Sequence, residues 1–179
     1  MTVERCALGV DPGTARMGYA VISQSKADLT LLVHGVLETA SDLPMPERLR
    51  QLYDGLLQVI DEYHPTELAI EDLFFNRNVR SALAVGQARG VVLLAAAHRE
   101  LAVYSYTPLQ VKQTITGFGR ARKEQIQEMM RVLLHLTTIP RPDDAADAAA
   151  LALCHLNRVA GHEAFQSMLP PSERMPRMR

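Results

Sequence analysis

The sequence contains little cysteine and no long apolar run. The 179 residues include two cysteines, Cys6 and Cys154, and each lies in an apolar stretch of sequence without a second cysteine nearby. This excludes a disulfide framework and indicates free, buried thiols in a reducing compartment. The apolar runs at 6–10 and 90–97 are too short for a signal peptide or a membrane span. We therefore expect a cytoplasmic protein without a membrane partner.

A net basic charge is also missing. The chain carries 19 Lys and Arg against 20 Asp and Glu, a formal net charge of −1, and this taken alone argues against nucleic-acid binding. The charges are nevertheless unevenly distributed. Residues 1–72 hold 12 acidic and 5 basic side chains, whereas residues 73–142 hold 10 basic and 3 acidic ones. This asymmetry is compatible with an anionic partner, and equally with a helical surface that carries arginines.

The pattern of apolar residues predicts a single α/β domain. Apolar runs indicate three strands of a meander and two later strands, at 5–11, 18–23, 29–39, 67–71 and 103–106. Apolar residues recur at helical spacing in five segments. These follow Pro46, cover 78–101, follow Pro108, lie around 126–134 and run from 143 to about 160. We expect a mixed sheet of about five strands flanked by helices, with the last two strands parallel. The domain is expected to span 1–165, followed by a flexible tail at 166–179.

Two helix starts can be recognised from their capping residues. Asn78 can cap the helix at 78–101, and Thr107 followed by Pro108 begins the next one. The helix at 78–101 carries small residues, among them Gly86 and Gly90, along one side. Small residues allow a close approach, so this side faces either the sheet or a second copy of the chain.

Acidic side chains occur where a buried element would not require them. Asp11 and Glu71 each end an apolar strand. Asp144 and Asp147 are one helical turn apart in an alanine-rich segment, with Asp143 beside them. Each has an ordinary explanation, because aspartate before Pro-Gly favours turns and acidic residues suit the first turn of a helix. Asp147 lies deeper in its helix, where burying an unpaired carboxylate would be costly.

Together these carboxylates can converge on one edge of the sheet. Carboxylates held close together repel one another unless a cation lies among them. Oxygen ligands suit Mg²⁺ or Mn²⁺, and the sequence has no cluster of cysteine and histidine that would suggest zinc. Two such ions about 3.5–4 Å apart can support in-line attack of water on a phosphodiester. The six histidines are scattered, so a Ser–His or Cys–His catalytic arrangement has little support.

These residues belong to five sequence blocks that resemble the RuvC-type Holliday-junction resolvases, bacterial endonucleases with a ribonuclease H-like fold. In order, the blocks are GVDPGT (9–14), AIE (69–71), GQARGV (86–91), QVKQT (110–114) and DAADA (144–148). The resemblance implies a homodimer that resolves four-way DNA junctions by paired symmetric nicks in homologous recombination and DNA repair. It also implies a branch-migration motor complex as a partner and two Mg²⁺ per active site, for which Mn²⁺ can substitute. The implied catalytic metal ligands are Asp11, Glu71, Asp144 and Asp147.

The resemblance further assigns residues that contact DNA. It places a junction-contacting aromatic at Phe74, whose ring could stack on an unpaired base, and functional lysines at Lys112 and Lys123. A lysine near the reacting phosphate can offset developing negative charge, and we expect this catalytic role for Lys123. Four arginines of the basic segment 73–142 would, together with Lys112, hold DNA phosphates without reading the base sequence. They are Arg77, Arg80, Arg120 and Arg122.

Three other functions are compatible with parts of this pattern. The first is a ribonuclease H-like nuclease that processes RNA, which can show a similar Asp-x-Gly turn after its first strand. The second is a sugar or acetate kinase or an actin-like ATPase, but those proteins need two copies of such a domain and this chain is too short. The third is a non-catalytic junction-binding protein, which would be expected to have lost at least one of the four carboxylates.

Overall fold

The structure is a computed structural model that describes residues 5–26, 28–72 and 79–168. Five strands form one sheet: β1 (Arg5–Asp11), β2 (Arg16–Ser25), β3 (Asp28–Glu38), β4 (Glu67–Glu71) and β5 (Ala102–Tyr106). Their order across the sheet is β3-β2-β1-β4-β5. The first three strands are antiparallel neighbours, whereas β1, β4 and β5 run parallel. The predicted mixed sheet, with its last two strands parallel, is therefore confirmed.

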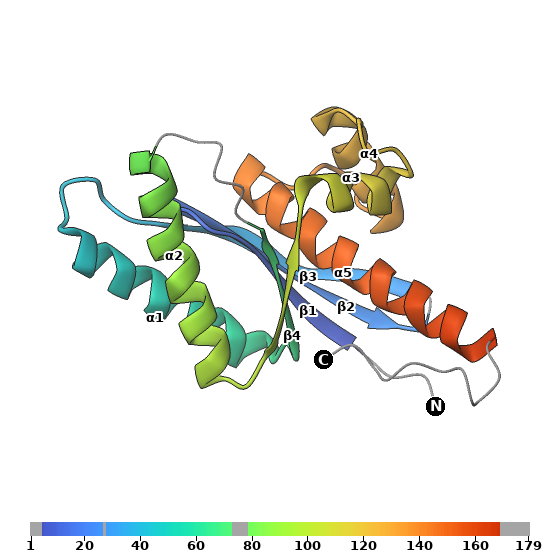
Figure 1. Cartoon of the computed structure of the whole chain (residues 1–179), viewed down its shortest axis with the longest axis horizontal. Helices are drawn as coiled ribbons and strands as arrows, with labels where there is room; N and C mark the ends of the chain where they lie inside the picture. The colour runs from blue at the N-terminus through green and yellow to red at the C-terminus, as the bar shows by residue number, and fades with distance from the viewer. Residues whose placement is uncertain (1–4, 27, 73–78, 169–179) are drawn as a thin grey trace.

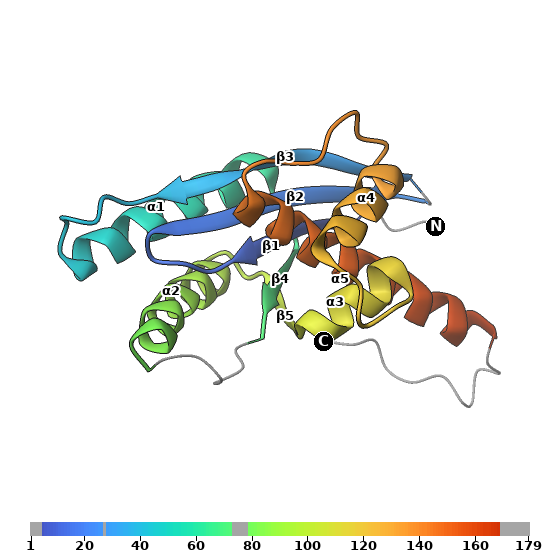
Figure 2. The same ribbon diagram turned by 90° about the horizontal axis from the view of Figure 1, so that it is seen from above.

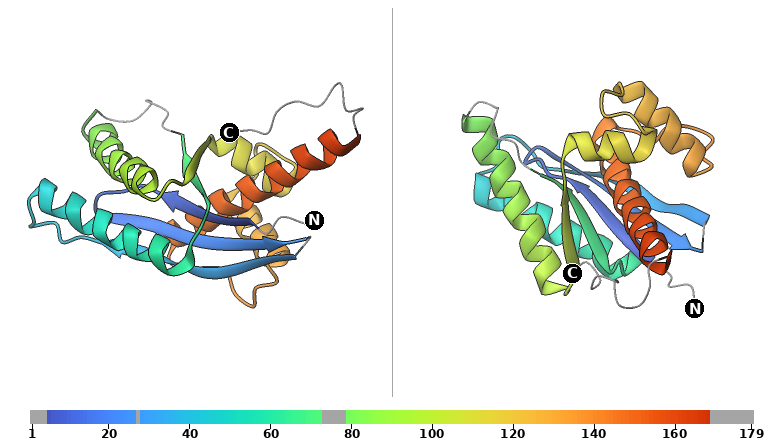
Figure 3. Two further views of the ribbon diagram at one scale, coloured as in Figure 1. Left: turned by 90° about the horizontal axis from the view of Figure 1, so that it is seen from below. Right: turned by 45° about the vertical axis from the view of Figure 1, so that its right-hand side comes forward.

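Helices cover both faces of this sheet (Figure 1). On one face lie α1 (Met45–Tyr63) and α2 (Val79–His98), and α5 (Asp143–Met168) crosses the other face over β1 and β2. Between them in the chain, α3 (Pro108–Thr116) and α4 (Lys123–Leu133) pack beside α5 (Figure 2). Figure 3 shows the resulting three layers, with the sheet in the middle. None of the helices in the described ranges is both long and apolar enough to cross a membrane.

Alternation of side chains along the strands produces two separate apolar cores. Leu8 and Val10 of β1 face α1 and α2, where they join a core that includes Leu52 and Val92. Ala7 of the same strand faces α5 and joins the second core. Successive residues of a strand point to opposite faces, so a strand buried on both faces reads as a continuous apolar run. This explains why β1 and β4 were recognisable from the sequence.

Helix α5 approaches the sheet unusually closely because two glycines face it. A Cβ atom on Gly9 of β1 would lie 2.0 Å from the carbonyl oxygen of Ala148, and one on Gly18 of β2 would lie 2.0 Å from that of Asp144. Both distances are far inside van der Waals contact, so only glycine fits at either position. The backbone of α5 therefore lies directly on the backbones of β1 and β2, which fixes the position of its first turns.

The helix ends agree with the capping pattern in part. Thr107 begins α3 through a capping box, because its hydroxyl accepts from the amide of Gln110 while the Gln110 side chain accepts from the amide of Thr107. The expected end of α5 near Ala160 is wrong, since the helix continues to Met168. An ion pair between Arg5 and Glu163, at 2.5 Å, fastens this additional stretch to β1.

Two further expectations have mixed outcomes. Cys154 is fully buried and Cys6 only partly, because Cys6 lies near the start of β1 at the margin of the sheet; both are free thiols. The expected flexible tail at 166–179 is wrong at its start, because residues 166–168 belong to α5. The expected helix cap Asn78 and residues 169–179 of the tail lie outside the described residues.

Candidate active site

The carboxylates of Asp11 and Glu71 are placed side by side by the parallel pairing of β1 and β4. Val10 pairs with Ile70 in this ladder, so the next residue of each strand lies at the same edge of the sheet. Alternation along β4 puts Glu67 and Glu71 on the face that α5 covers, and Glu67 there contacts His155 of α5. Both strand-end carboxylates therefore point toward the layer that contains α5.

Helix α5 supplies the other two predicted carboxylates from its first two turns. Its contacts with Gly9 and Gly18 bring Asp144 and Asp147 over the ends of β1 and β2. A cleft of about 390 Å³ opens here between the sheet edge and helices α2, α3, α4 and α5. Its charged lining residues are Asp11, Glu71, Lys112, Lys123 and Asp147.

The electrostatic environment of Asp11 reflects this convergence. Burial raises the pKa of Asp11 most strongly, and the negative charges of Glu71, Asp147 and Asp144 raise it further, to about 7. The positive charge of Lys123 acts in the opposite direction. A carboxylate whose neighbours are mostly carboxylates gains stability from any additional cation in the cleft.

Two cations of the chain partly compensate the acidic residues of α5. Lys123, the first residue of α4, lies 3.0 Å from Asp147 and 3.4 Å from Asp143. Arg16, at the start of β2, lies 3.3 Å from Asp144. These ion pairs are partly exposed to solvent, so each contributes little to stability. They place a positive charge of the chain next to each of the three acidic residues at the start of α5.

The arrangement does not amount to a closed metal site. Among the residues that the structure describes, no group of three His, Cys, Asp or Glu side chains is placed closely enough to hold a metal ion. Asp143 pairs with Lys123 and with Arg141, at 3.0 Å from the latter, whereas Asp144 is among the charges that act on Asp11. Asp144 thus differs from its neighbour Asp143 in raising the pKa of Asp11.

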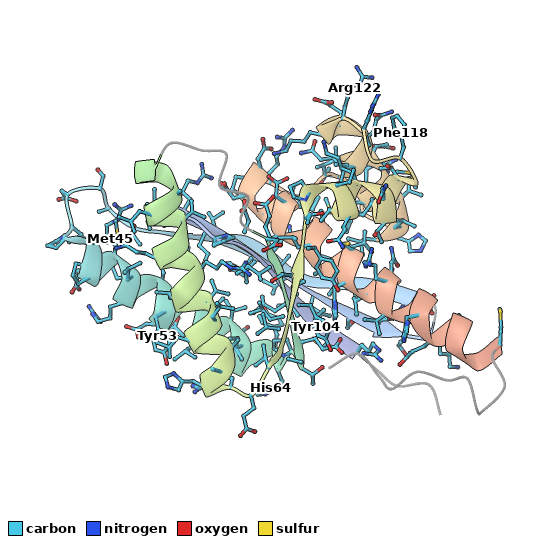
Figure 4. The ribbon with its side chains drawn as sticks, viewed as in Figure 1. Met45, Tyr53, His64, Tyr104, Phe118 and Arg122 are labelled. Carbon is cyan, nitrogen blue, oxygen red and sulfur yellow. The ribbon has the colours of Figure 1, made fainter. Side chains whose placement is uncertain are left out.

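The residues predicted to contact DNA fall in three places. Lys112 lines the cleft from α3. Arg120 and Arg122 are exposed in the connection between α3 and α4, and Figure 4 shows the Arg122 side chain projecting from this end of the molecule near Phe118. Phe74 and Arg77 lie outside the described residues. Arg80 is in the first turn of α2, but its side chain is not among those described.

Two arginines next to the carboxylates were not among the residues predicted from the sequence. Arg16 follows Asp11 by five residues, and the β1–β2 hairpin returns it to the same edge of the sheet. Arg89 of α2 donates hydrogen bonds to the backbone carbonyl of Glu71 and to the hydroxyl of Ser105. Its signal in the sequence was the GQARGV block, which was recognised without a role for its arginine.

A mixed five-stranded sheet with carboxylates at the ends of adjacent parallel strands and on a crossing helix defines a ribonuclease H-like protein. A sequence model described as crossover junction endodeoxyribonuclease RuvC matches residues 7–155. The chain belongs to the RuvC family. A relative named crossover junction endodeoxyribonuclease RuvC from Roseiflexus sp. (strain RS-1) is 55% identical over 87% of this chain and 92% of its own length. Another of the same name, from Rubrobacter xylanophilus, is 55% identical over 83% of each chain.

Solved structures agree with this assignment. The RuvC of T. thermophilus in complex with a Holliday junction substrate has a TM-score of 0.82 and 37% identity, covering 86% of this chain and 94% of that one. The yeast mitochondrial Holliday junction resolvase has a TM-score of 0.64 at 16% identity, covering 91% of this chain and 86% of that one, and supports the fold alone. The predicted family and its ribonuclease H-like fold are both confirmed.

Proposed function

We propose that this protein resolves four-way DNA junctions by paired symmetric nicks, in homologous recombination and DNA repair. The observation that carries the proposal is the cleft in which Asp11, Glu71 and Asp147 meet Lys112 and Lys123, within a chain of the RuvC family. The structure-selective nicking of DNA is the family's named activity, and the acidic cleft provides a place for it. The described domain, expected to span 1–165, contains all of these residues.

The metal that we propose is Mg²⁺, two ions per active site, for which Mn²⁺ can substitute. The donors fit such ions in type, since they are all carboxylate oxygens. Burial and then the neighbouring carboxylates raise the pKa of Asp11, and the contribution of these negative charges supports a bound cation. The residues that would hold the ions are Asp11, Glu71, Asp144 and Asp147. When bound, the metal supplies an activated water and stabilises the leaving oxygen of the phosphodiester.

Lys123 and Lys112 are proposed to act on the phosphate that is cut. Partial burial lowers the pKa of Lys123, but its hydrogen bond and charge interactions with Asp147 and Asp143 outweigh this effect and raise it. Lys123 is therefore protonated at neutral pH and presents a fixed positive charge in the cleft. Such a charge stabilises a phosphate more as negative charge develops on it during the reaction, so we assign Lys123 to catalysis and Lys112 to substrate binding.

The duplex arms of the junction are proposed to contact the basic surface around the cleft. Arg120 and Arg122 are exposed beside Lys123, where they can neutralise phosphates without reading sequence. The proposed contacts of Arg77 and Arg80 rest on their place in the basic segment 73–142. The stacking of Phe74 on a base rests on the family resemblance. A branch-migration motor complex as partner is also proposed from the family resemblance. A location in the cytoplasm is proposed because Cys6 and Cys154 are both free thiols, as in a reducing compartment.

A homodimer is proposed because paired symmetric nicks require two active sites related by a two-fold axis. Helix α2 has an exposed apolar side suited to this contact: Leu83 is 64% exposed and Leu94 is 51% exposed. On the same helix, a Cβ at Gly86 or Gly90 would meet no described atom within 4 Å. Leu94→Glu should lower the dimer population in sedimentation velocity at micromolar concentration. A wild-type chain that sediments only as a monomer would contradict this contact.

The proposed reaction is tested with a labelled four-way junction in Mg²⁺, in Mn²⁺ and with excess chelator. We expect the wild type to cut symmetrically in either metal and not with chelator. Asp11→Asn and Asp147→Asn should bind the junction normally but lose nicking by at least about 100-fold, because each lacks a proposed ligand. Asp54→Asn, an exposed carboxylate paired with Arg50 on α1, is the matched control and should cut normally.

Retained cleavage by Asp147→Asn would contradict the proposed ligand set. Cleavage of an RNA hairpin in preference to the junction would instead favour the RNA-processing alternative. Junction binding by the wild type without any nicking in either metal would favour a non-catalytic binding protein.

A further inference from the structure

The guanidinium of Arg89 connects helix α2 to the ends of two parallel strands. Its Nη1 donates a hydrogen bond to the backbone carbonyl of Glu71, the last residue of β4, and its Nη2 donates to Oγ of Ser105 in β5 at 2.8 Å. The side chain is half-buried between the helix and the sheet. Arginine suits this position because its planar group offers several donors in a fixed geometry, which lysine cannot match.

The contact with Glu71 reaches the backbone of a residue whose side chain lines the cleft. The carboxylate of Glu71 faces the α5 layer, while Arg89 approaches the same residue from the α2 layer. Glu71 also lies beyond the last residue pair between β4 and β1, which joins Ile70 to Val10. The strand end that carries Glu71 is therefore held by its pairing with β5 and by Arg89.

We propose that Arg89 is a positioning residue for Glu71. It fixes the backbone from which the carboxylate projects, and so keeps the carboxylate near Asp11 while the metal and the DNA bind. Val85, one turn earlier on α2, lines the cleft, so the same helix forms part of the wall and holds the strand end. This role rests on the proposed function of the cleft, because it concerns how one of the proposed ligands is held.

Helix α2 carries both Arg89 and the exposed side proposed for dimer contact. Arg89 lies between Gly86 and Gly90, which belong to the exposed side proposed for dimer contact. A displacement of α2 along or away from the sheet would pull on the carbonyl of Glu71 directly. The position of the helix is thereby linked to the position of the carboxylate.

The test compares Arg89→Gln and Arg89→Lys with Arg99→Gln as the matched control. Arg99 also makes two hydrogen bonds, with Asp61 of α1, but it is exposed and contacts none of the cleft residues. Three properties are measured: the single-turnover rate of junction nicking in Mg²⁺, junction affinity with chelator, and Mn²⁺ affinity of the DNA-free protein by electron paramagnetic resonance.

We expect Arg89→Gln to lower the nicking rate by about 10-fold or more and to weaken Mn²⁺ binding severalfold, since groups that orient metal ligands have effects of this size. Junction affinity should change by less than about 2-fold, because Arg89 is not among the proposed DNA contacts. Arg89→Lys should recover part of the loss through its remaining donor. Arg99→Gln should behave as the wild type in all three measurements.

The positioning role is refuted if Arg89→Gln nicks and binds Mn²⁺ like the wild type. It is equally refuted if Arg89→Gln loses thermal stability, junction affinity and nicking in proportion, as a merely structural residue would. A wild type that fails to nick would contradict the proposed function instead. In that case the Mn²⁺ affinities of wild type and Arg89→Gln still decide whether Arg89 positions the carboxylate.

Discussion

The close contact between α5 and the sheet can be tested with Gly9→Ala. The new methyl group would lie 2.0 Å from the carbonyl oxygen of Ala148 and 2.8 Å from the amide nitrogen of Ala152. Ordinary van der Waals contact begins near 3.4 Å, so the helix must move from β1 by roughly 1.4 Å to admit the methyl group. Overpacking of this kind costs about 1–3 kcal/mol, and backbone cannot rotate away as a side chain can.

The same displacement should affect catalysis as well as stability. Asp147 precedes Ala148 in α5, so it would move with the helix relative to Asp11. A misplacement of about 1 Å in a reacting site can lower the rate about 100-fold. We therefore expect a loss of about 1–3 kcal/mol in urea unfolding, together with a fall in the single-turnover rate of junction nicking of about 100-fold.

Gly161→Ala provides a matched control on the same helix. A methyl group there would meet no described atom within 4 Å, and alanine is the better helix former, so this variant should gain about 0.5–1 kcal/mol and nick normally. If Gly9→Ala unfolds at the same urea concentration as the wild type and nicks as fast, the backbone contact does not determine the position of the carboxylates.

Three further predictions follow from side chains around the site and beneath α5. Lys123→Met should lower the rate of junction nicking at least about 10-fold. Its free energy of unfolding should change by less than about 1 kcal/mol, because the ion pair of Lys123 with Asp147 is partly exposed. A parallel loss of nicking rate and stability would contradict a catalytic role. His155→Phe should cost about 2 kcal/mol or more in urea unfolding, since it removes the buried partner of the Tyr106 hydroxyl and one of the two partners of Glu67, the other being Arg5. An unchanged midpoint would contradict this. Burial raises the pKa of Glu67, but His155 and Arg5 outweigh burial and lower it. The ionised Glu67 therefore stabilises the fold above the ordinary glutamate pKa, and this stabilisation is lost as the pH falls through the lowered value. The free energy of urea unfolding of Glu67→Gln should accordingly depend less steeply on acid pH than that of the wild type.

Much of the fold could be predicted because its signals are local. The doubly buried strands appear as continuous apolar runs, and Thr107 with Pro108 and Gln110 contains the whole capping box. The end of α5 could not be located in this way. Gly161 interrupts the helical pattern, and the ion pair that holds the last turns joins Glu163 to Arg5, a residue remote in the sequence. Tertiary contacts override local propensity at such a position.

The candidate site could be predicted to the level of its carboxylates. Asp11 and Glu71 were recognisable because each ends an apolar strand, and Asp147 because it lies within an alanine-rich helix. Arg16 and Arg89 were not predicted, since surface arginines are common and nothing in their neighbours identifies which carboxylate or carbonyl they meet. Their contacts depend on strand register and on how a helix docks, which arise only when the chain has folded.

The site joins the earliest strand of the described chain to its last helix. During synthesis, β1 leaves the ribosome long before α5, and domains generally complete their folding when all their elements are available. Neither Asp11 nor Glu71 can meet Asp147 until residues 143–168 have been made and have docked on Gly9 and Gly18. The proposed nuclease centre therefore cannot be complete before α5 has been made, so a partly synthesised chain lacks the full set of carboxylates proposed as metal ligands.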